Sequence, residues 1–216
     1  MSSINLYNKD CMEAMKDMAD NQYDLAIVDP PYQILNTKTV ISKTHKNGTK
    51  TLNKNHKKIL WDKKPNENYF NILKKVSKNF ILFGANYFIK YINDSSSWIC
   101  WDKKVSNDVH LASAEFIYTT FTSSSKVIKI SPFDSLRGGK DIIHPTQKPV
   151  KLYEWLLMNY AKEGDKILDT HLGSGSIAIA CHNLKYNLDG FEIDKDYYND
   201  ALKRFNNHKS QIRLYE

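Results

Sequence analysis

A short stretch, Asp29-Pro30-Pro31-Tyr32, gathers side chains and backbone groups that could hold a planar amino-heterocycle. The aspartate carboxylate and a backbone carbonyl can together accept the two hydrogens of an exocyclic amine. The carbonyl is held in a fixed direction because proline restricts the backbone. The tyrosine ring can stack on the heterocycle. The alternative for these four residues alone is an exposed turn with no ligand.

A strand is needed to position this turn. The preceding residues, Leu25 to Val28, form a short apolar run that is typical of a buried strand. Neither proline can donate to a sheet ladder, so the strand has to end at Asp29. In open α/β sheets, ligands bind at the carboxyl ends of the strands. The turn is therefore predicted at a ligand-binding edge of a sheet.

A second group of residues is typical of a nucleoside cofactor site. Lys166 to Asp169 is a predicted strand, Gly173 and Gly175 form a glycine turn, and residues 177–184 form a predicted helix. Glycines let the backbone pass close to a ligand, and a helix N-terminus favours an anionic group. The next strand ends in the acid Glu192, about twenty residues further on, where an acid reaches the ribose hydroxyls of a bound nucleotide.

The other segments complete an alternating pattern of strands and helices. Further strands are predicted at residues 4–7, 80–84, 98–103 and 114–122, and further helices at residues 12–18, 68–76, 85–91, 150–161 and 196–207. This alternation predicts one α/β domain over residues 1–216, with a mostly parallel sheet and helices on both faces. Residues 33–64 and 123–143 lack periodicity and are predicted to be loops.

The charge of the chain is positive, and the excess is concentrated in one segment. Lys and Arg number 31 against 24 Asp and Glu, for a net charge of +7, and residues 33–64 hold nine lysines against the single acid Asp62. This segment follows the Asp29 turn directly, which favours contact with a polyanion over a merely solvated loop. The residues predicted to contact nucleic acid are Lys38, Lys43, Lys46, Lys50, Lys54, Lys57, Lys58, Arg137 and Lys140.

Cysteine usage and hydropathy predict a cytoplasmic protein. The three cysteines, Cys11, Cys100 and Cys181, lie far apart in the sequence, which suits a reducing compartment and predicts neither a disulfide framework nor a zinc site. No apolar run reaches the roughly 18 residues of a membrane span, and no signal peptide opens the chain. We therefore expect no membrane association.

Taken together and in this order, the motifs resemble the β group of DNA amino-methyltransferases. These enzymes transfer a methyl group from S-adenosylmethionine (SAM) to adenine N6 or cytosine N4. The resemblance covers most of the chain and rests on the Asp29 turn, on His144-Pro145-Thr146-Gln147-Lys148-Pro149, on residues 169–176 and on Glu192. It implies a Rossmann-like methyltransferase fold in which the catalytic motif precedes the cofactor motif. It also implies double-stranded DNA as substrate, a bacterial or phage origin, and an antiparallel strand near one edge, for which residues 114–122 are the candidate.

The resemblance also implies roles for individual residues. Asp29 and the Pro30 carbonyl would accept the amine hydrogens, Tyr32 would stack on a base flipped out of the duplex, and no metal would be required. Lys148 would hold the SAM carboxylate, whereas without the resemblance it would be interpreted as a solvated lysine. The expected catalytic residues are Asp29, Pro30, Pro31 and Tyr32. The expected cofactor-binding residues are Asp10, Cys11, Asp29, Lys148, Asp169, His171, Gly173, Ser174, Gly175, Ser176, Glu192 and Ile193.

Three residues show how closely the chain follows the pattern of this family. Thr170-His171 stands where family members usually have Pro-Phe, so an imidazole replaces the ring that lies against the cofactor and weaker SAM binding could follow. Asp29 at the first motif position favours adenine, because cytosine N4 enzymes more often have serine there. Cytosine N4 transfer, methylation of an RNA amine and a catalytically silent DNA-binding subunit stay open as alternatives. A homodimer and a cognate restriction endonuclease are compatible further partners.

Overall fold

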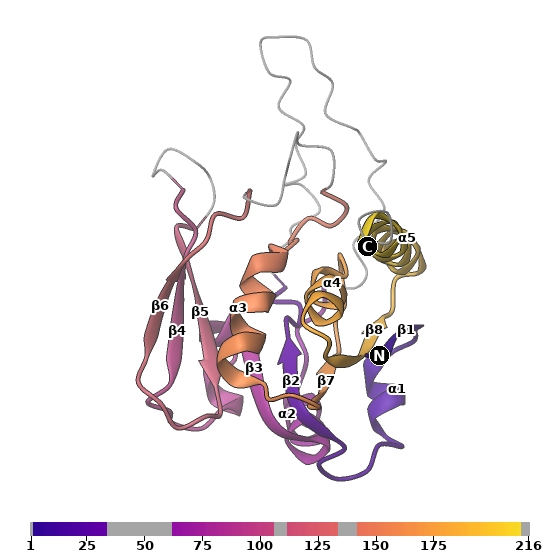
Figure 1. Cartoon of the computed structure of the whole chain (residues 1–216). Helices are drawn as coiled ribbons and strands as arrows, with labels where there is room; N and C mark the ends of the chain where they lie inside the picture. The colour runs from indigo at the N-terminus through magenta and orange to yellow at the C-terminus, as the bar shows by residue number, and fades with distance from the viewer. Residues whose placement is uncertain (1, 34–61, 106–111, 134–141, 213–216) are drawn as a thin grey trace.

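The computed structural model describes residues 2–33, 62–105, 112–133 and 142–212 (Figure 1). In this part of the chain, eight strands form one sheet in the order β1-β8-β7-β2-β3-β5-β4-β6. Their bounds are β1 Ile4–Asn8, β2 Tyr23–Val28, β3 Ser77–Phe83, β4 Trp98–Asp102, β5 Ala114–Thr119, β6 Lys126–Lys129, β7 Lys166–Asp169 and β8 Asn187–Glu192. Among these strands only β5 runs antiparallel to its neighbours, β3 and β4, which confirms the predicted antiparallel strand.

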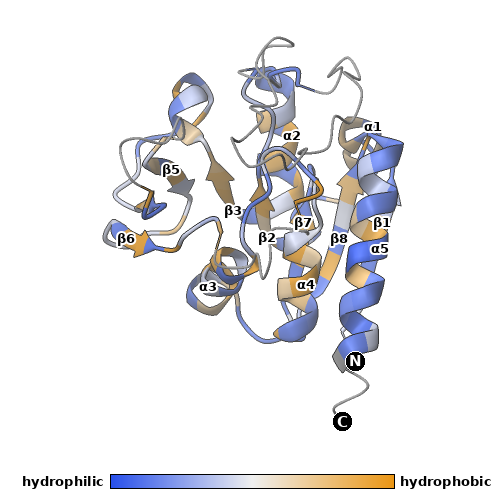
Figure 2. Ribbon diagram, turned by 90° about the horizontal axis from the view of Figure 1, so that it is seen from above, coloured by the Kyte–Doolittle hydropathy of each residue, from blue (hydrophilic) through white to orange (hydrophobic). Residues whose placement is uncertain are grey.

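Helices cover both faces of the sheet (Figure 2). One face carries α1 (Cys11–Met15) and α2 (Glu67–Val76), and the other carries α3 (Val150–Tyr160), α4 (Ser176–Asn183) and α5 (Lys195–Ile212). The predicted α/β fold, with its mostly parallel sheet, is therefore confirmed. None of the helices in the described ranges is long and apolar enough to cross a membrane.

The apolar run of β2 is explained by burial on both of its faces. Leu25 and Ile27 belong to the core cluster that includes α3 and α4, whereas Ala26 and Val28 belong to the cluster that includes α2. A strand that is covered on both faces has no solvent-facing positions, so its sequence is continuously apolar instead of alternating. These two clusters fix β2, and with it the turn at Asp29, at the centre of the sheet.

The centre of the sheet is also where the order of the strands reverses. β7 leads through α4 to β8 on one side, and β2 leads toward α2 and β3 on the other. β2 and β7 are themselves parallel neighbours. Such a reversal leaves a crevice at the carboxyl ends of the two central strands, where α/β proteins bind ligands. The Asp29 turn and the glycine turn both begin at this crevice.

The structure differs from the predictions in two segments. Residues 126–129, predicted to be loop, form the edge strand β6, which pairs with β4. Ile128 is its one buried side chain, so the sequence carries almost no apolar pattern there. Residues 85–91, predicted to be one helix, form two short 3₁₀ turns, η1 (Ala85–Tyr87) and η2 (Ile89–Tyr91).

Candidate active site

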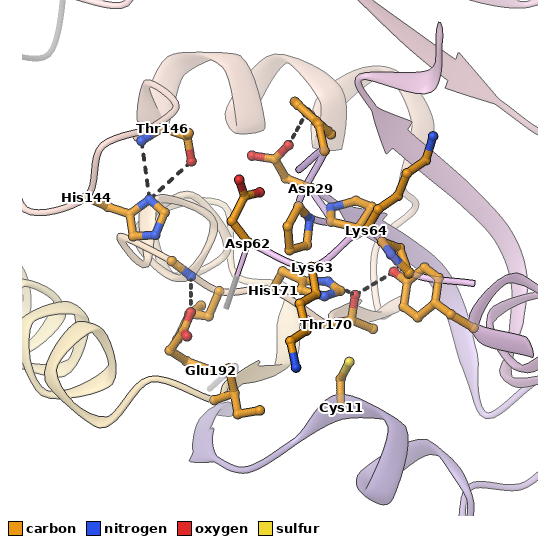
Figure 3. A pocket seen from close by; sticks show the side chains of 18 of the residues that line it. Cys11, Asp29, Asp62, Lys63, Lys64, His144, Thr146, Thr170, His171 and Glu192 are labelled. Atoms are coloured by element: carbon orange, nitrogen blue, oxygen red, sulfur yellow. Dashed lines mark hydrogen bonds between the residues drawn. The ribbon is translucent and has the colours of Figure 1, made fainter. Parts of the chain in front are cut away.

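A cavity of about 460 Å³ lies in the crevice at the carboxyl ends of β2 and β7 (Figure 3). Its volume falls in the range of small-molecule sites. The cavity is lined by residues from both halves of the sequence pattern. The predicted site residues on its wall are Asp10, Cys11, Asp29, Pro30, Pro31, Tyr32, Lys148, His171, Gly173, Ser174, Glu192 and Ile193. The two groups of residues identified in the sequence thus share one cavity.

At one end of the cavity, both oxygens of the Asp29 carboxylate are engaged by donors. The Tyr32 hydroxyl donates to Oδ1, and the Lys148 ammonium donates to Oδ2 at 2.7 Å. Burial raises the pKa of Asp29, against the opposing pull of the Lys148 charge, and the nearby Glu115 charge raises it further. Asp29 is therefore a buried carboxylate of increased basicity, which suits an acceptor for amine hydrogens.

The Tyr32 ring is held inward by its neighbours. It stacks on Tyr87 with the ring centroids 4.9 Å apart. A methyl group at Gly84 would lie 2.3 Å from the ring, and Gly84 itself has a φ of +58°. Glycine is thus needed there both for the backbone conformation and for the approach of the ring. In this conformation Tyr32 contacts Asp29 through its hydroxyl, while its ring packs on another aromatic side chain.

Glu115 completes this end of the site, although no motif in the sequence points to it. Its Oε1 lies 3.2 Å from the Lys148 ammonium, and its Oε2 lies 3.1 Å from that of Lys103. Burial raises the pKa of Glu115, but the two lysines outweigh burial and leave the pKa below its ordinary value. The signal in the sequence is a charged residue within the apolar and aromatic run of β5.

At the other end of the cavity, Glu192 closes the glycine turn. Its Oε2 accepts the backbone N–H of Gly173 at 2.8 Å (Figure 3). Its Oε1 accepts the backbone N–H of Asp194 at 2.9 Å. Gly173 has a φ of +52°, which an L side chain adopts only with strain. Asp10 caps α1 by accepting the Met12 N–H at 2.7 Å. Two carboxylates thus flank the turn at the ends of β8 and β1.

A chain of hydrogen bonds runs along the wall of the cavity. The Tyr69 hydroxyl lies 2.7 Å from Thr170 Oγ1, which lies 2.8 Å from His171 Nδ1 (Figure 3). Burial lowers the pKa of His171 to about 4, so the imidazole is neutral at pH 7. Tyr69 comes from α2, which the sequence predicts only as a helix, so its contact with the glycine motif could not be foreseen.

Three predicted cofactor residues do not line the cavity but support its wall. Asp169 accepts the backbone N–H of His171 at 3.0 Å, and burial raises the pKa of this carboxyl to about 8. The Ser176 hydroxyl donates to the Lys148 carbonyl at 2.7 Å. A methyl group at Gly175 would lie 3.2 Å from Ala201 Cβ, which places this glycine against α5.

All nine predicted nucleic-acid contacts lie outside the described residues. Two other lysines of the basic segment, Lys63 and Lys64, line the cavity together with Asp62 (Figure 3). The residues that fall outside the described ranges are Lys38, Lys43, Lys46, Lys50, Lys54, Lys57, Lys58, Arg137 and Lys140.

With this geometry established, comparison with known proteins decides the family. A family model for N6 and N4 methyltransferases, described as DNA methylase, matches residues 37–203. The chain belongs to this DNA methylase family. It therefore has the fold and the general activity that its motifs predict, namely SAM-dependent methylation of an amine in DNA.

Two type II methyltransferases are similar to this chain in sequence over most of their length. The type II methyltransferase M2.MboI of Moraxella bovis is 23% identical, with 94% of this chain and 88% of that protein covered. M.HpaI of Haemophilus parainfluenzae is 26% identical, with 89% and 71% covered.

Solved structures share the fold. The PvuII cytosine-N4-specific DNA methyltransferase has a TM-score of 0.64 at 14% identity, with 95% of this chain and 87% of that one covered. The M1.HpyAVI–SAM complex has a TM-score of 0.59 at 24% identity, with 93% and 99% covered.

The residues of the cavity fit SAM, the cofactor of the DNA methylase family. The glycine turn before α4 allows close approach of a ligand, since Gly173 carries no side chain at the wall. Glu192 retains acceptor capacity for a ribose hydroxyl, because its two oxygens offer about four lone-pair sites and backbone N–H groups of Gly173, Ile193 and Asp194 use at most three. His171 and Ile193 offer an aromatic and an apolar surface at the same end. We therefore assign the SAM end of the cavity to Asp10, His171, Gly173, Glu192 and Ile193 as a proposal.

Proposed function

We propose that this DNA methylase transfers the methyl group of SAM to the N6 amine of adenine in a specific sequence of double-stranded DNA. The proposal is carried by the buried Asp29 carboxylate on the wall of the cavity, 2.7 Å from the Lys148 ammonium. An aspartate at this motif position is typical of adenine enzymes. The neutral residues that the cytosine enzymes more often carry there could not accept amine hydrogens with a negative charge.

The proposed chemistry has to increase the nucleophilicity of an aromatic amine. The lone pair of adenine N6 is delocalised into the ring, so the amine is a poor nucleophile. When Asp29 and the Pro30 carbonyl accept its hydrogens, the lone pair is localised and aligned with the reacting carbon. Bound SAM supplies an electrophilic methyl group on a positively charged sulfur. Asp29 then takes the proton that the methylated nitrogen releases, which its raised pKa favours.

The target base has to leave the duplex for this reaction. Its amine cannot reach a cavity wall while it is stacked and paired, so we propose base flipping, with Tyr32 as a stacking residue. Lys63 and Lys64 lie at the cavity and belong to the lysine-rich segment 33–64, which we propose contacts the DNA phosphates. One methyltransferase domain would carry both functions. A second subunit and a cognate nuclease are further proposed partners.

Product analysis tests the proposal directly. Labelled SAM is incubated with the protein and unmethylated duplex DNA of mixed sequence, and the DNA is then digested to nucleosides. We expect the label in N6-methyladenine. Label in N4-methylcytosine would contradict the assignment of adenine, and label that appears only when structured RNA replaces DNA would contradict the choice of substrate.

The glycine turn provides a separate test of the SAM end. Gly173→Asp is expected to weaken SAM binding at least about tenfold, or ~1.4 kcal/mol, because the new side chain occupies the cavity wall beside His144 and Glu192. Calorimetry measures the affinity. Gly164→Asp is the matched control, since Gly164 also has a positive φ, +87°, and a Cβ added there would have no atoms within 4 Å. Equal affinities in the two variants would remove Gly173 from the cofactor site.

A further inference from the structure

Asp29 is not free to receive an amine in the described conformation. Its Oδ2 neutralises the Lys148 ammonium at 2.7 Å, and its Oδ1 accepts the Tyr32 hydroxyl. Each oxygen keeps a second lone pair, but a carboxylate that is already shared between a cation and a hydroxyl attracts amine hydrogens less strongly. The two donors therefore compete with the amine that Asp29 is proposed to bind.

One atom of Glu115 is a second acceptor for both competing donors. Glu115 Oε1 lies 3.2 Å from the Lys148 ammonium and 3.1 Å from the Tyr32 hydroxyl. The other oxygen, Oε2, is held by Lys103 at 3.1 Å. Lys103, which does not contact Asp29, therefore anchors one oxygen of the Glu115 carboxylate. The other oxygen, Oε1, faces the two donors. Either donor reaches it by a small displacement.

We propose that Glu115 is a positioning residue that receives Lys148 and Tyr32 when the target amine binds, which clears the Asp29 carboxylate. This inference rests on the proposed function, because it concerns the same amine. Lys148 is 6% exposed and remains paired throughout the exchange, so no buried charge is left without a partner. When Lys148 and Tyr32 move to Glu115, the amine replaces them as the partner of Asp29, and β2 keeps its position.

The proposal has a pH dependence because Asp29 must be ionised to act as acceptor. The charged and titratable groups around Asp29 are Lys148 before α3, Glu115 on β5, and Tyr32 in its own turn. Tyr69 of α2, Tyr153 of α3 and Asp169 of β7 also interact with its charge. Of these, Glu115 is an anion that disfavours ionisation of Asp29, and Lys148 is the cation that favours it.

A double-mutant cycle on stability tests, without any substrate, whether Asp29 and Glu115 share Lys148, which the exchange requires. Asp29→Asn and Glu115→Gln are each expected to lower the melting temperature only slightly, because Lys148 keeps one carboxylate partner in either variant. The double variant leaves Lys148 buried with none. Its loss is expected to exceed the sum of the single losses by at least about 5 °C, or to prevent folding altogether. Additive losses would show that Lys148 does not pass between the two carboxylates.

Kinetics of Glu115→Gln test the role in the reaction. We expect kcat to fall about tenfold to a hundredfold with unchanged SAM affinity, and the acid limb of the pH profile to move to lower pH, since Asp29 loses an anionic neighbour. Asp24→Asn is the matched control: this carboxylate lies at the opposite end of β2, paired with Lys78. Unchanged kcat and pH profile in Glu115→Gln would overturn the proposal.

The stability cycle and the kinetics of Glu115→Gln together distinguish a failure of this proposal from a failure of the proposed function. If the wild-type protein methylates adenine, Glu115→Gln has wild-type kinetics and the losses in the stability cycle are additive, only the role of Glu115 fails. If the wild-type protein methylates no DNA, the proposed function fails, and the stability cycle still decides whether Glu115 and Asp29 share Lys148.

Discussion

Asp29→Asn is expected to slow methyl transfer at least about a thousandfold while SAM affinity stays within about twofold. Asparagine presents one carbonyl acceptor and no negative charge, so it cannot localise the amine lone pair or take up the released proton. The SAM end of the cavity is proposed to consist of other residues, which follow β1, β7 and β8. The two effects should therefore separate cleanly.

Asparagine is a better replacement than alanine because of Lys148. Asparagine keeps a polar contact with the buried ammonium, and Glu115 remains as its charged partner. Single-turnover transfer of labelled methyl gives the rate, calorimetry gives the SAM affinity, and a melting curve confirms folding. Asp24→Asn again serves as the control, with wild-type turnover expected. Turnover within tenfold of wild type in Asp29→Asn would show that another group handles the amine.

Lys148→Met is expected to cause the largest loss of stability. Lys148 separates two buried carboxylates, at 2.7 Å from Asp29 and 3.2 Å from Glu115. Without this cation the two acids face each other across a buried space, and breaking such a buried arrangement costs about 3–5 kcal/mol. For a chain of this size, that corresponds to a decrease of about 10 °C in melting temperature.

The exposed ion pair between Lys78 and Asp24 provides the comparison for Lys148. The Lys78 side chain is 55% exposed, and its pairing is screened by water, so Lys78→Met is expected to leave the melting temperature unchanged. Similar losses for both variants would mean that the burial of Lys148 does not matter for stability.

Lys148→Met should also change the pH dependence of the residual activity. Lys148 holds the pKa of Asp29 down against burial and the Glu115 charge, so its removal raises that pKa further. A protonated Asp29 has lost the negative charge with which it is proposed to accept an amine hydrogen. The acid limb is therefore expected to move to higher pH, opposite to the shift expected for Glu115→Gln. SAM affinity is a separate readout here: a marked loss in Lys148→Met would support the predicted contact with the SAM carboxylate.

Features in which local pattern and burial coincide could be predicted from the sequence. The apolar run of Leu25 to Val28 and the prolines after it locate the central strand and its end, because both faces of β2 are buried. The glycine turn and the acid at Glu192 are recognisable because backbone conformation and spacing constrain them directly. These features depend on residues that are close in the sequence, and they place twelve predicted residues on one cavity.

Contacts between elements far apart in the chain could not be predicted in this way. Glu115 meets Lys148 only because β5 is inserted next to β3, and no local pattern encodes that neighbour. The same reason hides Tyr69, which reaches Thr170 from α2. The edge strand β6 is missed because its pairing with β4, rather than its own composition, makes it a strand.

The hydrogen-bond chain of Tyr69, Thr170 and His171 fixes the orientation of the His171 ring at the cavity wall. The Thr170 hydroxyl contacts Nδ1, so this ring nitrogen has a partner in the protein. The imidazole is neutral, and its other ring nitrogen, Nε2, is a polar group whichever nitrogen carries the proton. Related enzymes usually have phenylalanine at this position. This chain instead adds a polar nitrogen to the aromatic surface that faces the cofactor end.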